Sequence, residues 1–202
     1  MTVMEVIQKR RSARSYLDRP IEDAVILELL EAARLAPTGG NGQNHVFGVV
    51  KDYEIKLALA HASGNQMWIA EAPVVIACCA RLEADLNDLP ESDFGLRVNE
   101  LRFTKPLIQY LNAYPDRRAV GSLFANAAPL IPAEHMVLAA ASHGIQACYI
   151  GWLDVWEASR ILNLPDDMVC LFLLPMGYPK REPGTKKLKS IQEISFTDKY
   201  GE

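Results

Sequence analysis

Three arginines occur with two serines in a stretch of seven residues near the amino terminus. The stretch contains Arg10, Arg11, Ser12, Arg14 and Ser15. A guanidinium group stays charged and is rarely buried without an anionic partner, so the cluster is poor material for a core. It suits a phosphorylated ligand, because arginine offers forked donors to phosphate oxygens and a serine hydroxyl offers one more. A solvated basic face on a surface helix would contain the same residues.

A glycine-rich loop, residues 36–44, is predicted one helix further along the chain. Its glycines allow the main chain to approach a ligand closely, while the side chains between them can form hydrogen bonds. A plain turn from helix to strand needs about two such residues rather than a whole run. We therefore expect a ligand-binding loop that comprises Pro37, Thr38, Gly39, Gly40, Asn41, Gly42 and Gln43.

The two stretches resemble the signatures of the flavin-dependent nitroreductase family. That family opens with an Arg-Arg-Ser-x-Arg-x-aromatic element, which residues 10–16 match position for position. Its Pro-Ser/Thr-x-x-Asn-x-Gln loop is matched by residues 37–43. Further similarity lies at residues 144–151 and 175–179, so four islands follow the family's order along most of the chain.

The resemblance implies an α+β fold of the nitroreductase type. Such a fold has three layers, with a central mixed sheet flanked by helices, and forms an intertwined homodimer. A single domain would cover residues 1–202, with a variable insertion around residues 83–121 near the substrate site. The polar tail, residues 180–202, has too few apolar residues to fold alone and is expected to pack on the partner subunit.

The resemblance also names a cofactor, FMN, and implies which residues hold its phosphate. Arg10, Arg11 and Ser12 are the first candidates. In the family, a Lys-x-Arg pair after the Gly-Tyr-Pro turn closes the phosphate site. The lysines of this tail are out of register with that pair, so either Lys186 or Lys187 is a candidate for the role. A solvated basic tail is the alternative.

For the flavin ring, the resemblance implies one cation, one strand end and one loop. Arg14 would lie at the pyrimidine end, where a fixed positive charge stabilises the reduced flavin. We assign Arg14 this tuning role and assign no residue the role of acid or base. Ile150, Gly151 and Trp152 would lie beside the ring, because a glycine lets the main chain approach it. A turn glycine with a core tryptophan is the alternative. The loop 37–43 would reach the flavin of the partner subunit.

The spacing of apolar residues and the positions of capping and helix-breaking residues predict the helices and strands that position these residues. Thr2 and Glu5 form a capping-box pattern, which predicts a helix to about Arg11. Continuous apolar runs predict strands buried on both faces at residues 73–79 and 169–174. Helices are also predicted at 22–35, 54–62, 96–110, 132–142 and 155–162, a strand at 46–50, a strand end at 147–151 and a polar loop at 85–95.

The composition of the chain limits which kinds of partner it can bind and indicates its cellular compartment. The net charge is −4, so no general basic field invites nucleic acid. No apolar run reaches membrane-spanning length. Cys78, Cys79, Cys148 and Cys170 lie in apolar runs without CxxC spacing, which predicts buried reduced thiols rather than metal ligands or disulfides. We therefore expect a cytoplasmic protein that binds no nucleic acid, membrane or metal.

These features predict an FMN-dependent oxidoreductase. It would pass two electrons from NADH or NADPH to an electron-poor acceptor, such as a nitroaromatic or a quinone, in ping-pong order. The lack of nucleophile and metal motifs fits a cofactor that carries the chemistry. One departure from the family is Asn44-His45, which replaces the usual Pro-Trp after the loop. A flavin-binding or flavin-remodelling protein, or a pathway-specific redox enzyme on the same fold, is therefore an alternative. A binding module for another phosphorylated ligand is a third.

Overall fold

The computed structural model describes residues 1–82, 90–181, 184 and 186–201. Three of the predicted segments therefore lie partly outside the described residues. These segments are the polar loop at 85–95, the insertion around 83–121 and the tail 180–202.

Helices outnumber strands along the described chain. The α-helices are α1 Val3–Lys9, α2 Asp23–Arg34, α3 Tyr53–Ala62, α4 Phe94–Phe103, α5 Lys105–Ala113, α6 Arg117–Ala125, α7 Leu130–Ser142, α8 Val155–Ile161 and α9 Ile191–Ile194. Two short 3-10 helices are η1 Gly39–Asn41 and η2 Met67–Ile69. The strands are β1 His45–Val50, β2 Val74–Arg81, β3 Gln146–Ala147 and β4 Met168–Gly177.

The strands form one four-stranded sheet in the order β1-β2-β4-β3. Each neighbouring pair is antiparallel, with Val46 opposite Cys79 and Cys79 opposite Cys170. A parallel bridge joins Ser12 to Ala147 and adds the N-terminal segment beside β3. The sheet of the described residues is antiparallel rather than mixed as expected, because the parallel contact is an isolated bridge outside its four strands. The segment that carries the arginines therefore lies at the sheet's edge.

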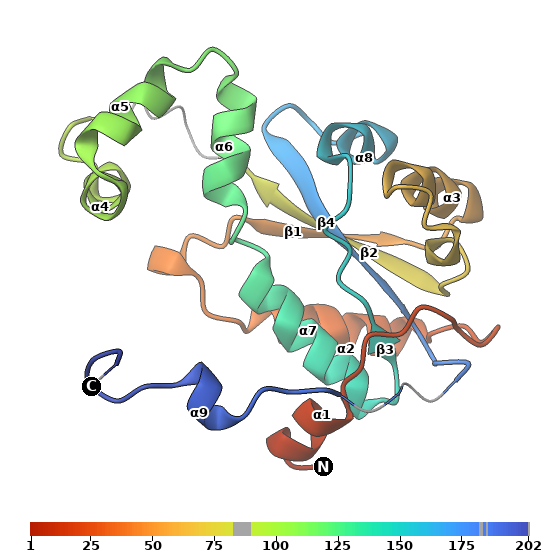
Figure 1. Ribbon diagram of the computed structural model, residues 1–202. Coiled ribbons are helices and arrows are strands. Elements are labelled where there is room, and N and C mark those ends of the chain that lie inside the picture. Colours follow the sequence, from red (N-terminus) through yellow and green to blue (C-terminus); the bar gives the residue numbers. More distant parts are fainter. Residues whose placement is uncertain (83–89, 182–183, 185, 202) are drawn as a thin grey trace.

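Helices cover both faces of the sheet, which gives the expected three layers (Figure 1). On one face, Leu29 of α2 and Met136 of α7 pack in a core with the strands. On the other face, Leu59 of α3 and Ala158 of α8 belong to a second core. β4 is buried along its whole length, and β2 is buried from its first residue to Ala80, which confirms two strands covered on both sides.

The first helix ends sooner than the sequence predicts. Thr2 Oγ1 accepts from the Glu5 main-chain N–H at 3.3 Å, and the Glu5 carboxylate accepts from the Thr2 N–H at 2.7 Å, which confirms the capping box. The helix stops at Lys9 rather than near Arg11, because Arg10 leaves the helical conformation (φ −56°, ψ 131°). The arginine cluster consequently lies on extended chain that pairs with β3.

Tyr16 fixes the far end of this extended chain. Its buried hydroxyl lies within hydrogen-bond distance of the carbonyl oxygens of Ala13, at 2.8 Å, and Pro175, at 3.1 Å. Gly177 lies against the Tyr16 ring, since a Cβ there would come within 2.8 Å of the ring and 2.6 Å of Pro73 Cδ. Side-chain and main-chain contacts therefore hold the arginine segment firmly to β4.

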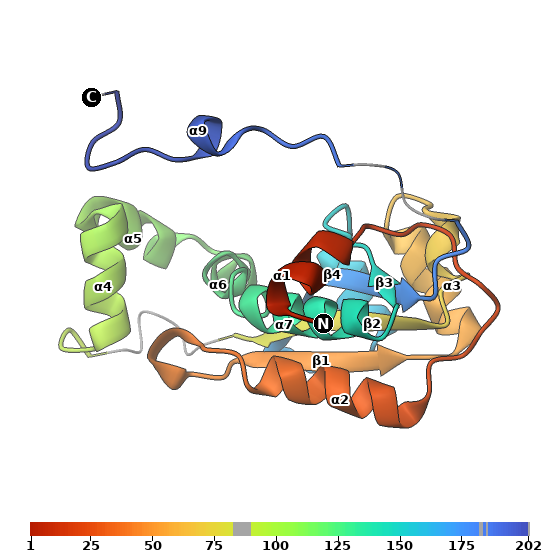
Figure 2. The same ribbon diagram turned by 90° about the horizontal axis from the view of Figure 1, so that it is seen from below.

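Two parts of the chain extend away from the layers (Figure 2). The first comprises α4, α5 and the start of α6; the single helix predicted for 96–110 is wrong, because Thr104 separates two helices with a φ of 71°. The second is the tail with α9. Its large apolar side chains are exposed: Leu188, Ile191, Ile194, Phe196 and Tyr200.

Further observations concern membranes, metals and cysteines. No single helix among the described residues is long and apolar enough to cross a membrane, although α6 and α7 pass that test together as a pair bent by 49°. Within the same residues, no group of three or more His, Cys, Asp or Glu is placed to hold a metal ion. All four cysteines are buried and free of disulfides, as predicted.

Gly177→Ala should destabilise the fold by about 1–3 kcal/mol, because the added methyl group has no room against Pro73 and Tyr16. Equilibrium unfolding in denaturant measures the change. Gly39→Ala is the matched control, since nothing lies within 4 Å of a Cβ at that position. The control should stay within about 0.5 kcal/mol of the parent protein. Equal free energies of unfolding for the two variants would show that the residues around Gly177 can move to accommodate a methyl group without loss of stability.

Candidate functional site

A buried glutamine attaches the arginine-bearing segment, residues 10–16, to β3. The Arg11 main-chain N–H donates to Oε1 of Gln146 at 2.6 Å, and Nε2 of Gln146 donates to the Lys9 carbonyl at 3.4 Å. The Ala13 N–H donates to the Ala147 carbonyl at 3.3 Å. Gln146 is only 8 % exposed, so its amide depends on these partners. The segment therefore has a fixed position on the edge of the sheet.

Lys186 joins Arg10 and Arg11 from the other end of the chain. Its Nζ donates to the Ile7 carbonyl of α1 at 3.2 Å. Desolvation lowers the pKa of Lys186, and the charges of Arg10 and Arg11 lower it further. Like charges are thus held close together, an arrangement that a bound anion would stabilise.

Arg11 also interacts with the end of α1. Its Nη1 donates to the Arg10 carbonyl at 3.0 Å and to the Gln8 carbonyl. Arginine commonly satisfies the last carbonyl groups of a helix in this way. Arg11 therefore adds charge to the cluster, while part of its hydrogen-bonding capacity is already used. Lys187 is exposed and has no hydrogen bond or ion pair within the described chain, so the structure brings Lys186, and not Lys187, to the cluster.

Ser12 and Arg14 lie close to Cys148, which follows β3. The Cys148 Sγ lies 3.8 Å from the Tyr149 carbonyl oxygen, and Ser12 and Arg14 both affect the pKa of the thiol. Burial raises the pKa of that thiol, whereas Arg14, Ser12 and Arg10 oppose the rise. Three residues of the arginine motif therefore meet at one point of the chain beyond β3.

The segment from Ile150 to Trp152 continues along β4. Ile150 exchanges main-chain hydrogen bonds with Leu173, at 2.9 and 3.2 Å. A Cβ at Gly151 would meet nothing within 4 Å, so the main chain is open to a ligand there. Trp152 is 75 % exposed and its ring packs on Gly64, which rules out the alternative of a core tryptophan.

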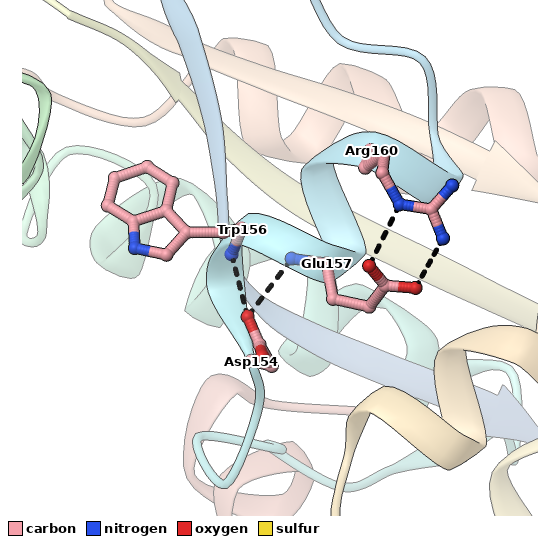
Figure 3. A network of polar contacts seen from close by, with 4 residues as sticks. All are labelled: Asp154, Trp156, Glu157 and Arg160. Carbon is pink, nitrogen blue, oxygen red and sulfur yellow. Dashed lines mark hydrogen bonds and ion pairs between the residues drawn. The ribbon is translucent and has the colours of Figure 1, made fainter.

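Asp154 anchors this segment at its far end (Figure 3). Its Oδ1 accepts hydrogen bonds from the main-chain N–H groups of Trp156, at 3.1 Å, and Glu157, at 3.0 Å, and so caps α8. The Asp154 N–H donates to the Ala62 carbonyl at 2.8 Å. Glu157 pairs in turn with Arg160 through two contacts, at 2.9 and 2.6 Å. The segment is therefore held between β4 and a well-capped helix.

The glycine-rich loop, residues 37–43, has a strained backbone. Asn41 and Gln43 adopt φ values of 57° and 51°, in the left-handed region that few residues other than glycine favour. Thr38 Oγ1 accepts from the Gln43 N–H at 3.2 Å, and Gln43 Nε2 donates to the Asn41 carbonyl at 3.3 Å. Strain that is held in place by local hydrogen bonds is common where a loop contacts a ligand.

This loop borders a cavity of about 670 Å³. Helix α6, the start of α7 and residues 166–167 form other walls. Val120, Phe124 and Ile131 supply apolar surface, and Arg118 supplies a charged group. A cavity of this size and lining suits a small organic molecule.

The two predicted halves of the site lie at opposite ends of the molecule (Figures 1 and 2). Both views place residues 10–16 beside β3, and both place the loop 37–43 at the far end near α6. One end holds Arg10, Arg11, Ser12, Arg14 and Lys186, while Ile150, Gly151 and Trp152 continue from Cys148 beside β4 to Gly64. The structure of one chain does not bring Pro37, Thr38, Gly39, Asn41 or Gln43 to these residues.

The residues at the first end fit FMN. A cluster of Arg10, Arg11 and Lys186 suits a phosphate, because its like charges are close together and Lys186 is partly desolvated. Gly151 leaves the main chain open to a ligand. Arg14 supplies a further cation near Cys148.

Sequence reasoning missed three contributors to this end. Gln146 holds the arginine segment, and the signal for it was a polar residue inside an apolar run. Glu134 of α7 accepts a hydrogen bond from the Tyr149 hydroxyl at 3.1 Å, and the signal was a carboxylate in an apolar helix. Gly64 adopts a φ of 66° beneath Trp152, at a Gly-Asn pair typical of turns.

Comparison with solved structures defines the class first. The chain matches B. megaterium NfrA2 with a TM-score of 0.75 at 25 % identity, covering 99 % of this chain and 76 % of that one. It matches B. megaterium NfrA1 with a TM-score of 0.73 at 28 % identity, covering 98 % and 74 %. The fold is therefore the nitroreductase-like α+β fold that the sequence implied.

The sequence comparison then gives the family. The model of the Nitroreductase family matches residues 7–178, and the chain belongs to this family. An "FMN reductase [NAD(P)H]" of Bacillus subtilis is 34 % identical over 204 residues, which are 98 % of this chain and 74 % of the relative. An "NADH dehydrogenase" of Thermus thermophilus is 31 % identical over 175 residues, or 86 % and 85 %. The resemblance drawn from the sequence is confirmed.

Gly64→Ala should displace Trp152, because the added Cβ would lie 2.8 Å from the indole ring. Tryptophan emission, recorded with Trp68 and Trp156 replaced by phenylalanine, should shift as the ring moves. Gly144→Ala is the control: Gly144 also has a left-handed φ, of 76°, but nothing lies within 4 Å of its Cβ position. An unchanged spectrum for Gly64→Ala would contradict the contact.

Proposed function

We propose that this chain is an FMN-dependent oxidoreductase that takes two electrons from NADH or NADPH and passes them to an electron-poor acceptor in ping-pong order. Membership of the Nitroreductase family supports the class of enzyme. Relatives named as reductases of FMN that use NAD(P)H support the cofactor and the electron donor. Nitroaromatics and quinones are the acceptors that we expect.

The crowding of Arg10, Arg11 and Lys186 is the observation that carries this proposal. These charges come from two ends of the chain, yet Lys186 reaches the Ile7 carbonyl of α1, and the charges of Arg10 and Arg11 add to the desolvation that lowers its pKa. A phosphate group relieves that repulsion and accepts several hydrogen bonds at once. A nucleotide-like cofactor would therefore supply the negative charge that these three cations lack.

Bound FMN would supply the two-electron chemistry, and the chain supplies position and field. Arg10 and Lys186 hold the phosphate, with added charge from Arg11 and a hydroxyl donor from Ser12. Arg14 places a positive charge where negative charge develops on reduction. The main chain from Ile150 to Trp152 flanks the ring, and the pairing with β4 keeps it in place.

The site is completed by a second copy of the chain. The loop 37–43 cannot contact the Arg10 cluster of its own subunit, since the two lie at opposite ends. In a homodimer, the loop of one subunit meets the cations of the other, with Pro37, Thr38, Gly39, Asn41 and Gln43 at the flavin. The cavity between this loop and α6 then faces the partner's flavin and receives the acceptor.

Two further elements belong to the same proposal. Residues 1–202 act as one domain, and the tail 180–202 packs its exposed apolar side chains on the partner subunit. Four buried cysteines without a disulfide fit a reducing compartment, and we place the enzyme in the cytoplasm.

Arg14→Ala should lower the midpoint potential of the bound flavin and slow its reduction by NADH or NADPH about tenfold or more, because a fixed cation is lost. A spectroelectrochemical titration and stopped-flow reduction measure the two effects. Arg14→Lys keeps the charge and should retain most of the potential. An unchanged potential in Arg14→Ala would remove the tuning role.

Mixing two inactive variants tests the shared site. Arg10→Ala and Asn41→Ala should each lose FMN, because each damages every site of a homodimer. Random mixing of the two subunits should restore FMN at about a quarter of the sites, since half of the dimers are mixed and each has one intact site. Flavin absorbance of the mixture, against each variant alone, measures the recovery. No recovery in mixed dimers would place both residues in the same subunit's site.

A further inference from the structure

Glu134 is a carboxylate on the helix that packs against α1, and Lys186 donates to the Ile7 carbonyl of α1. It lies on α7, one turn after the start of that helix, and accepts a hydrogen bond from the Tyr149 hydroxyl at 3.1 Å. Its charge acts on Lys186 and opposes the effects of Arg10 and Arg11 on that lysine. Arg10 in turn acts on Tyr149, the partner of Glu134. The charge of Glu134 therefore acts on Lys186, one of the cations proposed to bind the phosphate.

Tyr149 keeps this carboxylate in a defined place. Its ring packs on Phe172 of β4 at 5.6 Å between centroids, and burial, followed by the charge and hydrogen bond of Glu134, raises the pKa of the phenol. The phenol thus stays protonated and donates to Glu134 at physiological pH. Among the described residues, Glu134 forms no ion pair with Arg10 or Lys186, so it influences them through its field.

From this geometry we propose that Glu134 sets the affinity of the site for phosphate-bearing flavin by partly neutralising the cations that bind the phosphate. The inference rests on the proposed function, since it requires FMN at the Arg10 cluster. A fixed negative charge beside a dianionic phosphate repels it, and it also reduces the repulsion between Arg10, Arg11 and Lys186 in the free protein. Both effects make the binding free energy of FMN less favourable. Riboflavin lacks the phosphate and does not experience either effect.

Glu134→Gln tests this inference in the full-length protein stripped of flavin. Quenching of flavin fluorescence gives the dissociation constants of FMN and of riboflavin. We expect FMN to bind about fivefold more tightly or better at low ionic strength, with riboflavin unchanged. The gain should shrink as salt is added, because screening weakens the interaction of Glu134 with the phosphate.

Two control variants separate charge from structure. Glu134→Asp keeps the charge and should bind FMN as the parent protein does. Glu157→Gln removes a carboxylate from α8, where it pairs with Arg160, and should leave FMN binding unchanged. A Glu134→Gln variant that binds FMN no better than the parent protein, or that binds riboflavin more tightly by the same factor, would overturn the inference.

Failure of the proposed function has a different signature. Arg10→Ala, measured in the same titration, should weaken FMN binding and leave riboflavin binding unchanged. If Arg10→Ala has no effect on FMN, then the phosphate does not bind at this cluster and the proposed function itself fails. If Arg10→Ala weakens FMN binding and Glu134→Gln has no effect, only the role of Glu134 is rejected.

Discussion

The position of the arginine segment is the constraint on which the proposed site depends. It places Arg10 and Arg11 near Lys186, whose pKa is lowered by desolvation and then by the charges of the two arginines. The segment is held there by contacts to the sheet. Gln146 and Tyr16 supply them, because they attach the arginine segment to β3 and to the end of β4.

Much of the scaffold could be predicted, because it depends on local chemistry. The capping box of Thr2 and Glu5 is a short-range pattern, and the structure confirms it. The two buried strands, β2 and β4, were predicted from their unbroken apolar runs. The end of α1 was predicted wrongly, because the chain leaves the helix at Arg10 and the next two residues contact β3, Arg11 through Gln146 and Ser12 through Ala147. No local pattern encodes such a distant contact. Helix α6 was not predicted, although Val120, Leu123 and Phe124 recur at helical spacing.

The candidate site was predictable where it repeats a motif, and not where it depends on tertiary contacts. Residues 10–16 and 37–43 matched family signatures, and the structure places the first group together with Lys186. The sequence left Lys186 and Lys187 as equal candidates, because only the folded chain shows which of the two side chains is directed toward α1. Glu134 and Gly64 belong to elements that carry no motif, and only the folded chain brings them to Tyr149 and Trp152.

Under the proposed function, the anchoring of the arginine segment has a consequence for the rate at which a phosphorylated cofactor binds. Main-chain pairing with Ala147, the Gln146 amide and the Tyr16 hydroxyl hold the segment before any ligand arrives. An incoming anion therefore meets a receptor whose main chain is already ordered, and little conformational entropy is lost on docking. Encounter can then approach the speed set by diffusion and by long-range attraction, and the lifetime of the complex becomes the quantity that side-chain substitutions adjust.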